Sequence, residues 1–193
     1  MNTAFLDIDS QLDFLYPAGA LYVAGAERIL PVIARLNRYA AAHGIPVVST
    51  TDAHAENDVE FQLWPPHCVV GTWGQRKAEA TQLERHVVIP NRPCPLELDG
   101  ARQIVVEKQT VDVFLAPNLS RVIDALAADR FVLYGVVTEI CVLYAARGLL
   151  RTGKPLTVVT DAVAALSDEG SRQALAEIER SGGVLARSDE VVG

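Results

Sequence analysis

The sequence predicts a single α/β domain, built as a doubly wound, mostly parallel sheet of six strands flanked by helices. Short apolar runs alternate along the chain with segments of helical periodicity, which implies parallel β-α-β units with right-handed crossovers. Most of these runs are apolar throughout, as is typical of strands buried on both faces of a sheet. The length of 193 residues suits one domain spanning residues 1–193.

Each expected strand is a short apolar run bounded by turn or polar residues. The expected strands are residues 4–8, 46–50, 103–107, 131–135, 156–160 and 183–186. Helices are expected where apolar residues recur every three or four positions, in residues 25–43, 117–128, 139–151 and 168–181. Residues 51–98 are poor in regular pattern, and a loop this long is expected to be functional or to carry small elements of its own.

The composition argues against several classes of partner and location. A net charge of -7 at pH 7 argues against nucleic acid or an anionic membrane as a partner. No apolar run approaches the roughly 18 residues of a membrane span, and the first residues lack the features of a signal peptide. Three cysteines, in no disulfide-like spacing, favour a reduced, cytoplasmic setting.

Reactive side chains follow four of the expected strands. Asp9 follows the first strand, and Asp52 and His54 follow the second. Lys108 follows the third, and Cys141 lies just past the fourth. Ligands of open parallel sheets bind at the carboxyl ends of the strands. The sequence therefore predicts a catalytic site at this edge.

Cys141 is the candidate nucleophile. It lies at the end of FVLYGVVTEIC, where a buried strand leads into a helix whose expected N-cap is Thr138. Unpaired N–H groups and the positive helix end stabilise a thiolate in the first turn, and the same groups could hold an oxyanion. The alternative is a small core residue, because free cysteine is among the most buried residue types.

Asp9 and Lys108 are candidate partners of this thiol. A carboxylate at Asp9 could take the thiol proton and return it to a leaving amine. The residues alone leave Asp7 and Asp13 as alternatives, and they leave a capping role open for Asp9. Lys108 could hold the thiol and the carboxylate in their charged forms, or it could be a solvated lysine at a strand end.

The long loop contains a candidate metal site. TTDAH places Asp52 and His54 two residues apart, and His67 follows in WPPHCVVGT. Oxygen and imidazole ligands in this mixture suit zinc, iron or manganese. Alternatively, Asp52 could cap a turn and either histidine could be a satisfied polar group. His43 and His86 have no comparable placement and are interpreted as structural.

Together these residues resemble the isochorismatase-like cysteine hydrolases, nicotinamidases among them. The resemblance rests on D-x-Q-x-D-F from Asp9 to Phe14, on a strand-end Lys108, and on GVVTEIC ending at Cys141. It implies a Rossmann-like three-layer fold. It also implies a catalytic group of Asp9, Lys108 and Cys141, in which Asp9 is chosen over the neighbouring aspartates.

The resemblance implies further details of the site. It implies a cis peptide between Val136 and Val137, and an oxyanion site formed by the backbone N–H groups of Val137 and Cys141. It implies one divalent transition metal, with zinc preferred over iron or manganese. The implied ligands are Asp52, His54, His67 and, directly or through water, Glu60. Cys68 is implied to be a packing residue.

The resemblance also concerns the substrate. Phe14 and Trp64 match the aromatic pair that sandwiches a flat heteroaromatic ring in nicotinamidases. The stretch after Lys108 departs from the nicotinamidase pattern, so we expect Gln109, Phe114 and Leu115 to give the pocket a different wall. This departure concerns the identity of the substrate rather than the class of reaction.

The resemblance therefore implies a metal-dependent amidohydrolase that converts a small heteroaromatic primary amide to acid and ammonia. We also expect a homo-oligomer. One alternative is a metal-free relative acting on N-carbamoyl or ureido substrates. Isochorismate hydrolysis is less well supported, because enzymes of that kind need not keep the cysteine. A doubly wound binding or interaction domain is a non-enzymatic alternative, although no GxGxxG follows the first strand.

Overall fold

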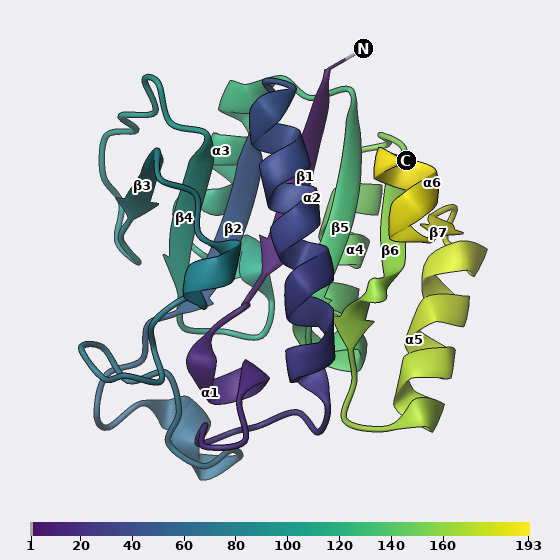
Figure 1. Cartoon of the computed structure of the whole chain (residues 1–193). Helices are drawn as coiled ribbons and strands as arrows, with labels where there is room; N and C mark the ends of the chain where they lie inside the picture. The colour runs from purple at the N-terminus through teal and green to yellow at the C-terminus, as the bar shows by residue number, and fades with distance from the viewer. Residues whose placement is uncertain (1) are drawn as a thin grey trace.

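The computed structural model describes residues 2–193, which form a parallel sheet with helices on both faces (Figure 1). The sheet has seven strands in the order β3-β4-β2-β1-β5-β6-β7, and every neighbouring pair is parallel. The strands are β1 (Thr3–Ile8), β2 (Val47–Asp52), β3 (His86–Ile89), β4 (Gln103–Lys108), β5 (Arg130–Val136), β6 (Leu156–Ala164) and β7 (Val184–Ala186). The predicted doubly wound α/β class is confirmed.

Helices cover the two faces of the sheet as two separate layers. They are α1 (Leu12–Leu15), α2 (Leu30–Ala42), α3 (Leu119–Leu126), α4 (Leu143–Leu150), α5 (Asp168–Arg180) and α6 (Ser188–Val192). Helices α3, α4 and α5 contribute to one hydrophobic cluster, and α2 contributes to the other, against which α6 packs. Successive β1 side chains alternate between these clusters, because neighbouring residues of a strand point to opposite faces.

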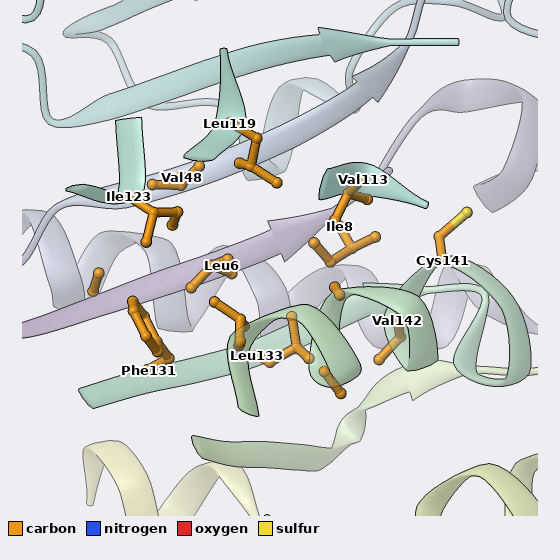
Figure 2. Packing of buried hydrophobic residues seen from close by; sticks show 14 of the residues in the cluster. Leu6, Ile8, Val48, Val113, Leu119, Ile123, Phe131, Leu133, Cys141 and Val142 are labelled. Atoms are coloured by element: carbon orange, nitrogen blue, oxygen red, sulfur yellow. The ribbon is translucent and has the colours of Figure 1, made fainter. Parts of the chain in front are cut away.

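The first of these clusters leads to the edge of the sheet where Cys141 lies. Figure 2 shows Leu6, Ile8 and Leu133 packed between the sheet and its helices, with Cys141 at one end of the group. Leu6, Ile8 and Leu133 are fully buried. Truncating a side chain buried in this way typically costs about 2–5 kcal/mol. The reactive edge is therefore supported by a rigid core.

The sheet has one strand more than predicted. All six expected strands are present, but β3 lies within the stretch interpreted as an irregular loop. It is only four residues long and pairs along one side with β4, and Val88 within it is 53% exposed. A short edge strand of this kind has too little buried apolar surface for its sequence to identify it.

Two expected helices begin differently from the prediction. The segment 25–43 divides into a 3-10 turn, η1 (Ala26–Ile29), and α2, whereas the segment 139–151 begins as a π-helical turn, η5 (Thr138–Val142), before α4. Thr138 was expected to cap this helix, and that prediction is wrong. The extended residue Val137 occupies the capping position, and the buried Thr138 hydroxyl has no hydrogen-bond partner among residues 2–193.

None of the helices within residues 2–193 combines the length and the apolar composition that crossing a bilayer would require.

Candidate active site

The predicted reactive residues meet at the carboxyl edge of the sheet. Asp9 follows β1, Asp52 ends β2, Lys108 ends β4 and Cys141 lies in the η5 turn after β5. These four strands are contiguous in the order β4-β2-β1-β5, so their carboxyl ends lie side by side. The topology thereby brings together residues that are far apart in the sequence.

The backbone around Asp9 and Gly135 sets the position of the candidate catalytic carboxylate. Asp9 has a positive φ of 48°, and its Oδ1 accepts a hydrogen bond from the Thr50 hydroxyl at 2.7 Å. Gly135 has a φ of 121°, and a Cβ there would overlap the carbonyl oxygen of Ile8. Glycine therefore allows β5 to run close against the end of β1, just before Asp9.

Lys108 lies at the centre of the site and is completely buried. Its ammonium nitrogen is 2.6 Å from Asp52 Oδ1, 2.9 Å from Asp9 Oδ2 and 3.8 Å from Cys141 Sγ. Burial alone would lower the pKa of Lys108, but Asp52 and Asp9 outweigh this effect and hold that pKa well above its ordinary value. Lys108 is thus a buried cation and not a solvated lysine.

Burial raises the pKa of both the thiol and its neighbouring carboxylate. Burial raises the pKa of Cys141 well above its ordinary value, although the positive charge of Lys108 opposes this effect. Burial also raises the pKa of Asp9, with Lys108 again opposing it. The expected thiolate, stabilised by the helix end, is therefore not what this environment favours, because burial is the larger effect. Cys141 needs a base beside it, and Asp9 is within hydrogen-bonding reach.

The structure separates Asp9 from the other two aspartates of its motif. Asp7 is buried, with Lys77 Nζ 2.6 Å from its Oδ2 and Asn37 donating to the same oxygen at 2.9 Å. Asp13 Oδ1 accepts from the backbone N–H of Ala20, and its Oδ2 accepts from that of Cys68. Both therefore tie segments of the fold together, away from Lys108.

Asp52, His54 and His67 form a compact buried group suited to a metal ion. One ligand atom from each lies within 4.8 Å of those of the other two. His67 donates from Nδ1 to the Pro65 carbonyl at 2.8 Å, which leaves its Nε2 facing Asp52. The Nε2 of His54 is buried 3.7 Å from Asp52 and has no hydrogen-bond partner among residues 2–193. An unpaired ring nitrogen facing other ligands fits a metal ion.

Glu60 lies beside this group but outside it. It belongs to the 3-10 turn η2 (Val59–Gln62) and lines the same pocket as Asp52 and His67. Burial raises the pKa of Glu60, and the negative charge of Asp52 adds to the effect. The predicted contact of Glu60 with a metal, directly or through water, stays a prediction.

Two residues contact the candidate metal group in a way that the sequence did not predict. Gln11 accepts a hydrogen bond from the Asp52 N–H at 2.6 Å and donates to the Asp52 carbonyl at 2.8 Å. Asp58 Oδ2 lies 3.0 Å from Nδ1 of His54. The only signal for Asp58 was its spacing of four residues from His54.

A pocket opens beside the candidate catalytic group and the candidate metal group. Phe14 and Trp64, the predicted aromatic pair, both line it. The sequence did not identify the other apolar lining residues, which include Leu21, Val23, Val111, Ile140 and Leu166. Ile140 lies beside Cys141 in η5, whereas the others come from connecting segments whose approach to the sheet edge no local pattern reveals.

The segment after Lys108 does not form the predicted pocket wall. Gln109 accepts a hydrogen bond from Asn91, and Leu115 is 69% exposed. Phe114 packs so closely on α4 that a Cβ at Gly148 would overlap its ring. Val111 is the residue of this segment that reaches the pocket. Gln109, Phe114 and Leu115 therefore lie outside the pocket lining, and the segment after Lys108 contributes Val111 to it instead.

Glu139 connects the turn that carries Cys141 to the segment that carries Leu166. Its Oε1 accepts from the backbone N–H groups of Leu166 and Ser167 at 3.0 and 3.1 Å. Leu166 lines the pocket together with Cys141.

The peptide between Val136 and Val137 is cis, as the resemblance implied, and both residues line the pocket.

The remaining cysteines and histidines lie outside the catalytic group. Cys68 is fully buried, and burial raises the pKa of its thiol. Cys94 is half-buried, and the side-chain amide of Asn118 donates a hydrogen bond to its sulfur at 3.7 Å. His43 stacks on Tyr39 at the end of α2 with ring centroids 4.0 Å apart, and His86 begins β3.

Comparison with known proteins relates this geometry to one family. The isochorismatase domain matches residues 3–190. A nicotinamidase of Acinetobacter baylyi is 27% identical over 192 residues, which cover 89% of this chain and 86% of that protein.

Two solved structures are similar over nearly the whole chain. A pyrazinamidase of Pyrococcus horikoshii in complex with zinc has a TM-score of 0.80 at 26% identity, covering 97% of this chain and 99% of that chain. An N-carbamoylsarcosine amidase from Thermoplasma acidophilum has a TM-score of 0.80 at 27% identity, covering 100% of each chain. The similarity thus extends to enzymes named for different amide substrates.

Proposed function

This chain belongs to the isochorismatase family, and we propose that it is a metal-dependent cysteine amidohydrolase of the nicotinamidase type. Its enzyme class, a hydrolase of carbon–nitrogen bonds other than peptide bonds, follows from the family and its nicotinamidase relatives. The proposed reaction converts a small heteroaromatic primary amide to the acid and ammonia through a thioester on Cys141.

A single observation carries this proposal: Lys108 contacts Asp9, Cys141 and Asp52 at once. Asp9 takes the thiol proton, and the Cys141 sulfur attacks the amide carbon. The buried charge of Lys108 stabilises the anionic species that form beside it. Asp9 then returns the proton to departing ammonia and activates the water that hydrolyses the thioester.

The pocket supplies the other elements that this reaction needs. The backbone N–H groups of Val137 and Cys141 hold the oxyanion, and Phe14 and Trp64 flank the substrate ring. Asp52, His54 and His67 would hold one divalent metal, zinc being the first candidate, with Glu60 contributing directly or through water. When bound, this metal would supply a Lewis-acid site able to bind and orient a ring nitrogen of the substrate.

An N-carbamoyl substrate is the second candidate. Similarity over the whole chain to an N-carbamoylsarcosine amidase supports it. A metal-free reaction on such a substrate would use Cys141, Asp9 and Lys108 in the same roles. It would leave the buried Nε2 of His54 without a function, which is why we favour the metal-dependent reaction.

A screen for ammonia release separates these proposals. Purified protein is incubated with primary amides and N-carbamoyl compounds, each with and without a chelator. The metal-dependent proposal predicts release from heteroaromatic amides that falls on chelation. Release confined to N-carbamoyl compounds and insensitive to the chelator would favour the second candidate.

A further inference from the structure

Asp58 lies between the metal group and the wall of the pocket and contacts both. Its Oδ2 lies 3.0 Å from Nδ1 of His54, and its Oδ1 accepts the Glu60 N–H at 2.9 Å. We propose that Asp58 is a positioning residue that fixes the tautomer of His54 for metal binding and anchors the turn that carries Glu60. The inference rests on the metal site of the proposed function.

The tautomer follows from the chemistry of the two partners. An ionised carboxylate only accepts hydrogen bonds, so the proton of His54 resides on Nδ1. Its Nε2 then keeps a free lone pair, 3.7 Å from Asp52 Oδ1. A carboxylate behind a ligating histidine also makes that histidine a better ligand, and loss of such a partner typically weakens metal binding about 10–100-fold.

The second oxygen of Asp58 connects this histidine to the pocket. By accepting the Glu60 N–H, it caps the turn η2, and the Trp64 N–H in turn donates to the Glu60 carbonyl at 3.1 Å. Both Glu60 and Trp64 line the pocket. One carboxylate thus places a metal ligand and the turn that forms part of the substrate wall.

The His54 ring is held by more than this hydrogen bond. It packs against Phe61 and His67, with ring centroids 5.2 and 4.8 Å away. Replacing Asp58 should therefore leave the ring in place while removing the control of its proton. This makes a positioning role separable from a general loss of folding.

Two substitutions change the contact of residue 58 with His54 and keep an oxygen that caps the turn η2. Asp58→Asn keeps an oxygen to accept the Glu60 N–H, but turns its amide NH₂ toward Nδ1 and so favours the proton on Nε2. Asp58→Ser also keeps a capping oxygen but is too short to reach His54. Glu56→Gln is the matched control, because it removes one carboxylate from an exposed position two residues away.

Zinc affinity is measured for metal-free protein by competition with a chromophoric chelator, and the His54 tautomer by imidazole ¹⁵N NMR. We expect zinc binding to weaken about 10–100-fold in Asp58→Asn and Asp58→Ser and to be unchanged in Glu56→Gln. In metal-free wild-type protein the proton should reside on Nδ1, and in Asp58→Asn on Nε2.

The inference would be overturned if Asp58→Asn bound zinc as tightly as the wild-type protein does. It would also be overturned if the His54 proton of the wild-type protein resided on Nε2. Neither measurement uses an amide, so failure of the proposed reaction is seen separately, as absence of ammonia release by the zinc-loaded wild-type protein.

Discussion

The ammonium of Lys108 donates a hydrogen bond to Asp52 Oδ1 at 2.6 Å, so the candidate catalytic lysine is paired with a candidate metal ligand. The same ammonium lies 2.9 Å from Asp9 and 3.8 Å from the sulfur of Cys141. The proposed chemistry at the thiol and the proposed metal ligation are therefore joined through one buried cation.

Replacing this cation should affect both stability and activity. Lys108→Met leaves Asp9 and Asp52 buried without a counter-charge, and breaking a buried pair in this way typically costs about 3–5 kcal/mol. Urea denaturation of the metal-free variant measures this loss. Adding Asp9→Asn to Lys108→Met should recover part of the stability, because it removes one uncompensated charge. If Lys108→Met were as stable as the wild-type protein, the stabilising role of the buried ion pairs of Lys108 would be contradicted.

Gly135 should tolerate no side chain. Gly135→Ala places a Cβ against the Ile8 carbonyl at a φ of 121°, so the free energy of unfolding should fall by at least about 1–3 kcal/mol. Thermal or urea unfolding measures the change. Gly153→Ala is the control, since it also has a positive φ but has nothing within 4 Å of the added Cβ. Equal losses of unfolding free energy in Gly135→Ala and Gly153→Ala would mean that the close approach of Gly135 to the Ile8 carbonyl has no effect on stability.

Glu139 should act on substrate binding through Leu166. Glu139→Ala removes the acceptor for two backbone N–H groups, so the pocket wall loosens and KM should rise more than kcat falls. Leu166→Ala should change selectivity among amides by about 10–200-fold, as apolar reshaping of a pocket does. Glu169→Ala, an exposed substitution in α5, is the control for steady-state kinetics. If Glu139→Ala lowered kcat and left KM unchanged, the predicted action of Glu139 on substrate binding would be contradicted.

Metal removal should raise KM for substrates that carry a ring nitrogen. We expect chelation to weaken nicotinamide and pyrazinamide hydrolysis mainly through binding, and re-added zinc to restore it. Benzamide, which lacks a ring nitrogen, should be a poor substrate and respond little to the chelator. Benzamide reacting as well as nicotinamide would contradict the role of the metal in binding the ring.

Much of the fold could be predicted, because strands buried on both faces are apolar runs. Strand β3 escaped prediction because it is a short edge strand with Val88 half exposed. The reactive residues could be located because each follows a strand and parallel strands align their carboxyl ends. Phe114 was misplaced because closeness to Lys108 in sequence does not make it close in space, and its ring packs under α4.

Asp58 and Leu166 illustrate what the sequence could not provide. Asp58 reaches His54 only because the η2 turn folds its carboxylate back onto the histidine. Leu166 reaches the pocket through a loop after β6 that Glu139 holds by its backbone. Both contacts depend on tertiary structure rather than on a periodic pattern.

The thioester on Cys141 is the central claim, and trapping it is the most direct test. Wild-type protein is quenched with acid during turnover of nicotinamide and analysed by intact and peptide mass spectrometry. We expect the mass of the acyl group on the peptide containing Cys141, none on those containing Cys68 or Cys94, and no ammonia release by Cys141→Ala. Turnover by Cys141→Ala, or acylation of another residue, would contradict the mechanism.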